Sequence, residues 1–134
     1  MTGNFDRNSV IIDSYAWIEY FNGTQKGAKA RKIIESTSSK LYTVDVCLAE
    51  IKFWALSENK DFQKLLSIIL SNSTIMNTNS DDWLKAADIK FEKRKHSKNF
   101  GLVDAIIISK SLDVRSMILT GDKHFGDEPQ TMGI

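Results

Sequence analysis

Four acidic residues of the chain stand at positions that are awkward for a charged side chain. Asp13 and Asp122 each follow a short apolar run, and Glu50 and Asp104 fall on the apolar faces of two predicted helices. Carboxylates a few ångströms apart repel by about 1 kcal/mol per pair in water and by more when desolvated. Mg²⁺ or Mn²⁺ removes that repulsion, activates water and polarises phosphoryl oxygens. Together the four positions predict a divalent-metal site.

Each of these acids also has a plainer explanation when it is taken alone. Glu50 lies in the apolar arc of a predicted helix over 44–58, where a salt bridge to a lysine such as Lys52 would compensate its burial. Asp104 stands in the first turn of a predicted helix, where the helix dipole stabilises a negative charge. Asp13 and Asp122 could each cap a helix or form a turn. A shared metal site explains all four at once, and we prefer it for that reason.

The elements that must position these acids alternate between strands and helices. Strands are predicted over 9–12, 41–43, 73–76 and 117–120. Helices are predicted over 15–21, 27–35, 44–58, 61–71 and 102–112, and another begins with Ser80 as its N-cap. This alternation predicts an α/β fold, a three-layer α/β/α sandwich around a mostly parallel sheet. Ligands bind beyond the carboxyl ends of the strands in such sheets, which is where Asp13 and Asp122 fall.

Length and composition indicate one globular domain. A chain of 134 residues with 42% hydrophobic and 26% charged residues can build its own core and is not disordered as a whole. The single cysteine, Cys47, excludes an internal disulfide. We expect residues 9–134 to form the domain and the polar segment 1–8 to be a disordered extension.

No apolar run in the sequence is long enough for a signal peptide or a membrane helix. The longest uninterrupted runs, such as 105–108, have only four residues, whereas a membrane helix needs about 20. We therefore expect a cytoplasmic protein with no membrane contact. The net charge is only +1, so any nucleic acid would have to bind a local basic patch.

Four short motifs give the sequence a family resemblance. They are VIIDS over 10–14, LAEI over 48–51, LVDAII over 102–107 and ILTGDKHF over 118–125. In order and spacing they resemble the PIN-domain nucleases, and within them the VapC-like toxins of type II toxin–antitoxin pairs. Each motif is weak alone, but all four occur in register across nearly the whole chain.

The resemblance implies a PIN-like fold and a role for each motif residue. Asp13, Glu50, Asp104 and Asp122 would be the catalytic, metal-binding acids, and the hydroxyls of Ser14 and Thr120 would support them. The implied activity is endonucleolytic cleavage of RNA by water activated with Mg²⁺ or Mn²⁺. The implied partners are a small antitoxin and a second copy of the chain in a homodimer. Many relatives carry an acid where this chain has His124, which removes one possible ligand.

A basic run just before Asp104 is the candidate RNA-binding segment. Such a run is usually a solvated face, although its position beside the acids favours phosphate contact. A weaker basic candidate lies over 26–32, and we interpret Trp17, Trp54 and Trp83 as core or dimer-interface residues. We interpret His124 as an RNA or surface contact and not as a metal ligand. The residues predicted to contact RNA are Lys93, Arg94, Lys95, Lys98, Lys123 and His124.

Other functions fit the sequence less well. A non-catalytic RNA-binding or scaffold PIN domain would keep the fold but lose one of the acids, and all four are present. A stand-alone RNA-processing nuclease would have the same sequence features as a toxin. A response regulator needs paired acids after its first strand, and a haloacid-dehalogenase-like phosphatase needs Asp-x-Asp, whereas this chain has Asp13-Ser14-Tyr15.

Overall fold

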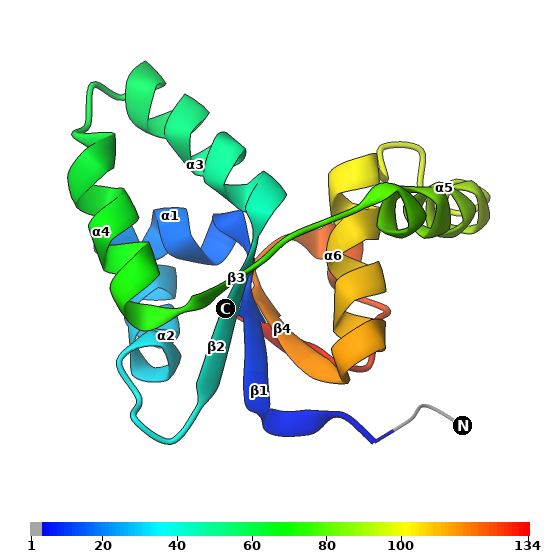
Figure 1. Ribbon diagram of the computed structural model, residues 1–134, viewed down its shortest axis with the longest axis horizontal. Helices are drawn as coiled ribbons and strands as arrows, with labels where there is room; N and C mark the ends of the chain where they lie inside the picture. The colour runs from blue at the N-terminus through cyan, green and yellow to red at the C-terminus, as the bar shows by residue number, and fades with distance from the viewer. Residues whose placement is uncertain (1–3) are drawn as a thin grey trace.

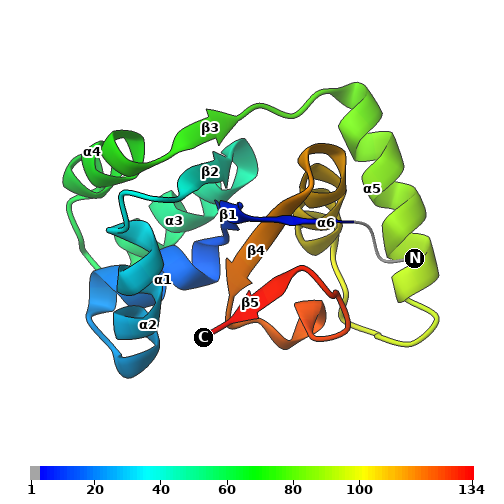
Figure 2. The ribbon, with the colours of Figure 1, turned by 90° about the horizontal axis from the view of Figure 1, so that it is seen from below.

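The computed structural model describes residues 4–134, which fold around a five-stranded sheet. All neighbouring strands are parallel, in the order β3-β2-β1-β4-β5 (Figure 2). The strands are β1 (Asp6–Ile12), β2 (Lys40–Val44), β3 (Thr74–Met76), β4 (Ser116–Thr120) and β5 (Thr131–Gly133). The predicted parallel sheet is confirmed, with β5 as an additional edge strand.

The helices cover both faces of the sheet. Helices α1 to α4 lie on one side of it and α5 and α6 on the other (Figure 1), which confirms the predicted three-layer sandwich. Their bounds are α1 (Ser14–Asn22), α2 (Gln25–Ile34), α3 (Asp45–Ser57), α4 (Phe62–Asn72), α5 (Ser80–Lys93) and α6 (Leu102–Val114), with a short 3₁₀ helix η1 (Lys123–Phe125).

Most element boundaries differ from the prediction by one to three residues, and two of the differences change its interpretation. The N-cap of α5 is Asn79 and not Ser80, because the Asn79 side chain accepts a hydrogen bond from the Asp82 N–H and Asp82 accepts one from the Asn79 N–H. This reciprocal pair is a capping box, which satisfies two amide groups at once. Strand β1 begins at Asp6, so residues 6–8 of the expected N-terminal extension belong to the sheet, and residues 1–3 lie outside the described residues.

Alternation along β1 builds two hydrophobic cores. Val10 and Ile12 are fully buried on the side of α1 to α4, whereas Ile11 is fully buried on the side of α5 and α6. Both faces of a central parallel strand are covered by helices, so consecutive apolar residues are needed. Trp17 is buried in the first core and donates its indole N–H to Thr43 Oγ1 at 3.1 Å, as its interpretation as a core residue predicts.

Gly27 lets α2 approach the backbone of α1. A Cβ at this position would lie 2.0 Å from the carbonyl oxygen of Glu19, a main-chain atom that has no room to rotate aside. We expect Gly27→Ala to lower the free energy of unfolding by about 1–3 kcal/mol, the usual cost of overpacking. Urea denaturation measures this, with Gly133→Ala as the control because its Cβ would meet nothing within 4 Å. Equal stability of the two variants would contradict the close approach.

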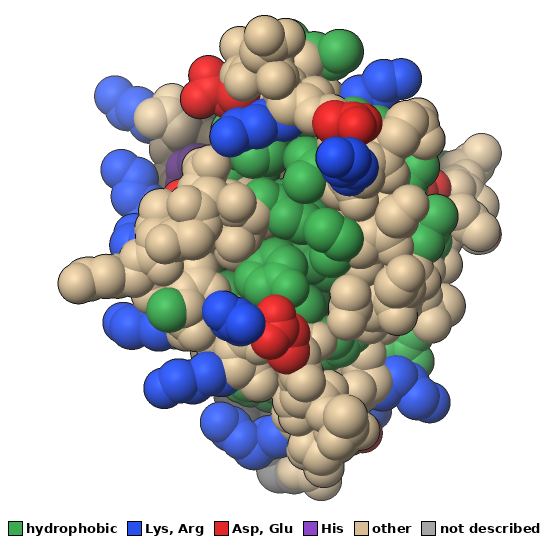
Figure 3. All heavy atoms as spheres, turned by 90° about the vertical axis from the view of Figure 1, so that its left-hand side faces the viewer, with side chains coloured by type: hydrophobic (Ala, Val, Ile, Leu, Met, Phe, Trp, Pro, Cys, Tyr) green, Lys and Arg blue, Asp and Glu red, His purple; other side chains and the backbone are tan. Residues whose placement is uncertain are grey.

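Hydrophobic side chains are exposed on α3 and α4. They include Phe53 and Leu56 of α3 and Ile68 and Leu70 of α4. Figure 3 looks onto the side of the molecule that α1 to α4 cover, where hydrophobic side chains line a hollow.

Within residues 4–134, none of the helices combines the length and apolar character needed to cross a bilayer.

Candidate metal centre

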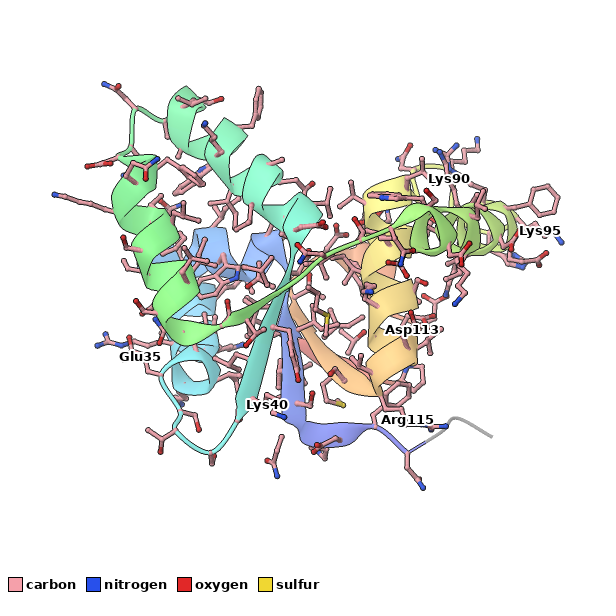
Figure 4. All side chains as sticks on the ribbon, in the orientation of Figure 1. Glu35, Lys40, Lys90, Lys95, Asp113 and Arg115 are labelled. Carbon is pink, nitrogen blue, oxygen red and sulfur yellow. The ribbon has the colours of Figure 1, made fainter. Side chains whose placement is uncertain are left out.

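The predicted site lies at the carboxyl edge of the sheet, between the central strand β1 and its neighbour β4. β1 and β4 pair side by side, and Asp13 follows β1 while Asp122 comes two residues after β4 ends. From β1 the chain continues to β2 on one side of the sheet, and from β4 it continues to β5 on the other side. Open parallel sheets bind ligands at such a switch point in strand order. Lys40 and Arg115 mark the opposite, amino edge of the sheet (Figure 4).

Asp13 is buried and does not cap the helix that it precedes. Although it stands at the N-cap position of α1, its side chain makes no capping hydrogen bond within the described chain. One carboxylate oxygen instead accepts a hydrogen bond from Thr120 Oγ1 at 2.8 Å, and the residue is only 5% exposed. Burial, and to a lesser extent the negative charges of Glu50 and Asp122, raise the pKa of Asp13 to about 7. Capping therefore does not explain Asp13.

Glu50 projects from α3 toward the same place. Its Oε1 accepts a hydrogen bond from Ser14 Oγ at 2.8 Å, and Glu50 makes no ion pair among residues 4–134. The alternative partner, Lys52, lies with its Nζ 5.8 Å from the centre of the Phe62 ring. Burial and the charges of Asp104 and Asp122 raise the pKa of Glu50. A lysine salt bridge therefore does not compensate this carboxylate.

Asp104 both caps its helix and belongs to the acidic group. Its Oδ2 accepts a hydrogen bond from the Gly101 N–H at 3.0 Å at the start of α6, as the helix-terminus explanation predicts. Burial nevertheless raises the pKa of Asp104, and the charge of Asp122 adds to the increase. The helix end therefore does not fully compensate this negative charge.

His124 lies with the acids and not on the outer surface. Asp122 caps the start of η1, because its Oδ1 accepts a hydrogen bond from the backbone N–H of His124 at 2.9 Å. The imidazole Nδ1 lies 3.1 Å from Asp104 Oδ2 and 3.4 Å from Asp122 Oδ1. That nitrogen is buried and has no hydrogen-bond partner in the part of the chain that the structure describes. The interpretation of His124 as an RNA contact stays a prediction, and its place beside Asp104 and Asp122 makes it a candidate ligand as well.

The potential ligands form two adjoining groups. Asp13, Cys47 and Glu50 form one, Asp104, Asp122 and His124 form the other, and the ligand atoms in each lie within 4.8 Å of one another. Cys47 was not predicted as a site residue. It is fully buried in the core, and burial raises the pKa of its thiol well above the usual value. The two groups adjoin, since the charges of Glu50 and Asp122 raise the pKa of Asp13 and the charge of Asp104 raises that of Glu50.

The donor set fits a divalent cation. Burial and neighbouring carboxylates raise the pKa values of Asp13, Glu50 and Asp104. The buried His124 Nδ1 faces two carboxylates and makes no hydrogen bond among the described residues. Carboxylate oxygens are the ligands that Mg²⁺ and Mn²⁺ prefer, and imidazole is accepted by Mn²⁺ and later transition metals. A bound cation would relieve the repulsion and give the nitrogen a partner.

The sequence matches the family model of the PIN domain over residues 10–127, a range that contains all four acids. The chain belongs to the PIN-domain family. Solved structures agree in fold. The chain superposes on a toxin–antitoxin complex from Klebsiella pneumoniae with a TM-score of 0.72 and 18% identity, over 92% of this chain and 95% of that chain. Among curated proteins, none matches the chain in sequence.

Two further structures share the PIN-domain fold. One is VapBC2 from Rickettsia felis bound to a DNA fragment from its promoter, with a TM-score of 0.71 and 14% identity over 94% of this chain and 97% of that chain. The other is the toxin VapC20 from Mycobacterium tuberculosis, described as cleaving the sarcin–ricin loop. Its TM-score is 0.68 and its identity 15%, over 87% of this chain and 92% of that chain. At these identities the likeness is one of fold.

A basic pocket adjoins the acidic centre of this PIN domain. It has a volume of about 580 Å³, and three lysines and two histidines outnumber two acids in its lining. These residues are Lys93, Lys98, Lys123, His96, His124, Glu92 and Asp127. Lys98 and Lys123 make no ion pair within residues 4–134. Their ammonium groups therefore stay available to a phosphate beside the acids.

The other predicted RNA-binding residues of the PIN domain have structural partners. Lys93 forms ion pairs with Asp127 and Glu128, and Arg94 donates its Nε–H to the Phe100 carbonyl at 2.6 Å. Lys95 pairs with Glu92 at 3.1 Å on the outer side of the domain (Figure 4). The structure thus lines the pocket with Lys93, Lys98, Lys123 and His124. Lys93 is held by two acids, and Arg94 ties the loop that carries Lys98 to Phe100.

Proposed function

We propose that this PIN domain is an endoribonuclease that requires Mg²⁺ or Mn²⁺. The observation that carries the proposal is the gathering of Asp13, Glu50, Asp104 and Asp122 at one edge of the sheet, with three of their pKa values raised. Buried carboxylates without positive partners destabilise a fold. A divalent cation is the compensation that also supplies chemistry.

The residues divide the work by their contacts. The four carboxylates would hold the cation, while Ser14 orients Glu50 through its hydroxyl and Thr120 orients Asp13 in the same way. When bound, Mg²⁺ or Mn²⁺ supplies an activated water and polarises the scissile phosphoryl group. Because Thr120 Oγ1 also accepts the Asp122 N–H at 3.0 Å, one hydroxyl fixes the positions of two acids. Fixed carboxylates need no reorganisation during the reaction.

The basic pocket would bind the RNA strand next to the acids. Log affinity falls with log salt, and we expect Lys98→Ala and Lys123→Ala each to make this slope shallower by about 0.7. That is the effect of losing one phosphate contact on a single strand. Fluorescence anisotropy with a labelled single-stranded RNA, over about 50 to 200 mM salt, measures this. An Asp104→Asn background prevents cleavage during the titration.

Lys95→Ala is the matched control, because Lys95 belongs to the same basic run but does not line the pocket and already pairs with Glu92. The slope measured with Lys95→Ala is expected to equal that of the protein in which none of these lysines is changed. A larger decrease with Lys95→Ala than with Lys98→Ala would place the RNA elsewhere.

We further propose a toxin role, with a small antitoxin protein as partner and a homodimer as the working form. The solved structures that share the fold support the antitoxin partner, since they include a toxin–antitoxin complex and VapBC assemblies. The exposed apolar side chains of α3 and α4 are available for such contacts. Co-expression with a small protein encoded beside it, followed by purification and a cleavage assay, tests the pairing. We expect the two proteins to purify as a complex that does not cleave RNA, whereas the chain purified without its partner cleaves it.

The ends of the RNA products test the reaction itself. Attack by activated water leaves 5′-phosphate and 3′-hydroxyl ends, so the products are expected to be ligatable without end repair, and EDTA is expected to stop their formation. Products with 2′,3′-cyclic phosphates, or cleavage that continues in EDTA, would contradict the metal-dependent reaction. RNA binding without cleavage would support a scaffold role instead.

A further inference from the structure

His124 is held in one orientation beside the acids. The backbone N–H of His124 donates a hydrogen bond to Asp122 Oδ1. The imidazole ring packs edge-on against the buried Phe100, with 6.0 Å between the ring centres. The side chain is 19% exposed, and Nδ1 is the ring atom that faces Asp104 and Asp122. Because the backbone and the ring are both fixed, this nitrogen stays directed at the two carboxylates.

The distances between the three donor atoms suit one shared ion. Nδ1 lies 3.1 Å from Asp104 Oδ2 and 3.4 Å from Asp122 Oδ1. Two ligand atoms that each lie about 2.1 Å from a metal, at angles between octahedral and tetrahedral, are separated by about 3.0–3.4 Å. Nδ1 makes no hydrogen bond among the described residues, and the two carboxylates that face it are the groups that would share the ion.

We propose that His124 is a metal ligand, and that with Asp104 and Asp122 it makes a mixed nitrogen–oxygen site that selects Mn²⁺, Co²⁺ or Zn²⁺ over Mg²⁺. This inference rests on the proposed function, because it concerns the same metal centre. Imidazole suits transition metals, whereas Mg²⁺ prefers carboxylates and water. The alternative is that the imidazolium form of His124 only pairs with the two carboxylates.

Nitrogen coordination can be observed directly with Mn²⁺ as the probe. Pulsed electron paramagnetic resonance of protein with about half an equivalent of Mn²⁺ is expected to show coupling to ¹⁴N, replaced by ¹⁵N coupling when histidine is ¹⁵N-labelled. The chain has two histidines, so His96→Asn is the matched control and is expected to keep the coupling. His124→Asn is expected to lose it while still binding Mn²⁺ through the acids.

Selectivity is measured by displacing Mn²⁺ with Mg²⁺. We expect His124→Asp, which restores an oxygen ligand, to reduce the preference for Mn²⁺ over Mg²⁺ by about 10-fold or more. Mn²⁺ binding and RNA cleavage without nitrogen coupling in the wild-type protein would overturn the ligand assignment and leave the nuclease intact. No Mn²⁺ binding by the wild-type protein would contradict both proposals. The wild-type measurement needs no variant, so it holds even if a His124 variant fails to fold.

Discussion

Asp13→Asn is expected to make the metal-free protein more stable at pH 8, by several kcal/mol, while abolishing cleavage. Asp13 is 5% exposed and its pKa is raised from 3.8 to about 7, chiefly by burial. A shift of this size corresponds to a cost of about 4 kcal/mol once the carboxyl group must ionise in the folded state. Asparagine removes the charge and keeps an oxygen that can accept the hydrogen bond from Thr120.

The same shift fixes the sign of the pH dependence. Between about pH 4 and pH 7 the unfolded state has already lost the Asp13 proton and the folded state still holds it, so stability falls as pH rises through this window. We expect Asp13→Asn to lack that decrease. Urea denaturation in EDTA, at several pH values, measures both. Unchanged or lower stability of Asp13→Asn at pH 8 would contradict the account of Asp13 as an uncompensated acid.

Asp82→Asn provides a control of opposite sign. Asp82 is also buried, but its pKa is lowered, first by the hydrogen bond from the Asn79 N–H and also by the bond from Lys110 at 3.2 Å. Neutralising a compensated carboxylate is expected to destabilise the protein at pH 8. The contrast between the two variants separates an acid that a metal must stabilise from one that the fold already stabilises.

The parallel sheet and its helices were predictable because their signals are local. The run Val10-Ile11-Ile12 needs cover on both faces and fits a central strand, and the longer apolar segments supply the helices. β5 was missed because three residues, Thr131–Gly133, carry no such pattern and form a strand only by pairing with β4. The cap of α5 was misplaced by one residue, since Asn79 and Ser80 are both good N-caps.

The acids were predictable for a different reason. Glu50 on an apolar helix face and Asp13 at a strand end are conspicuous in the sequence itself, and parallel strands bring such ends to one edge. The place of His124 depends on the η1 turn, although its position two residues after Asp122 was a usable signal. The role of Lys93 could not be predicted, because its partner Glu128 is 35 residues away in the chain.

Asp104→Asn is expected to reduce metal-dependent RNA cleavage by at least about 100-fold. The variant removes a negative oxygen from the metal centre, and a loss of about 2.7 kcal/mol of transition-state stabilisation already corresponds to that factor. Asparagine keeps an oxygen that can accept the Gly101 N–H, so the start of α6 is expected to remain capped. The loss should therefore not come from unfolding.

Asp82→Asn is the matched control for this experiment as well. Asp82 occupies in α5 the capping-box position that Asp104 occupies in α6, but it lies outside the metal centre. Circular dichroism at the assay temperature checks that both variants are folded.

The most direct measurement is cleavage of a labelled total-RNA pool by wild-type protein and these two variants, with Mg²⁺, with Mn²⁺ and with EDTA. Cleavage by the wild type and Asp82→Asn that needs metal, and its loss in Asp104→Asn, are the predicted results. Equal cleavage by Asp104→Asn and Asp82→Asn, or no cleavage by folded, metal-loaded, partner-free wild type, would contradict the assignment of the acidic centre as a nuclease site.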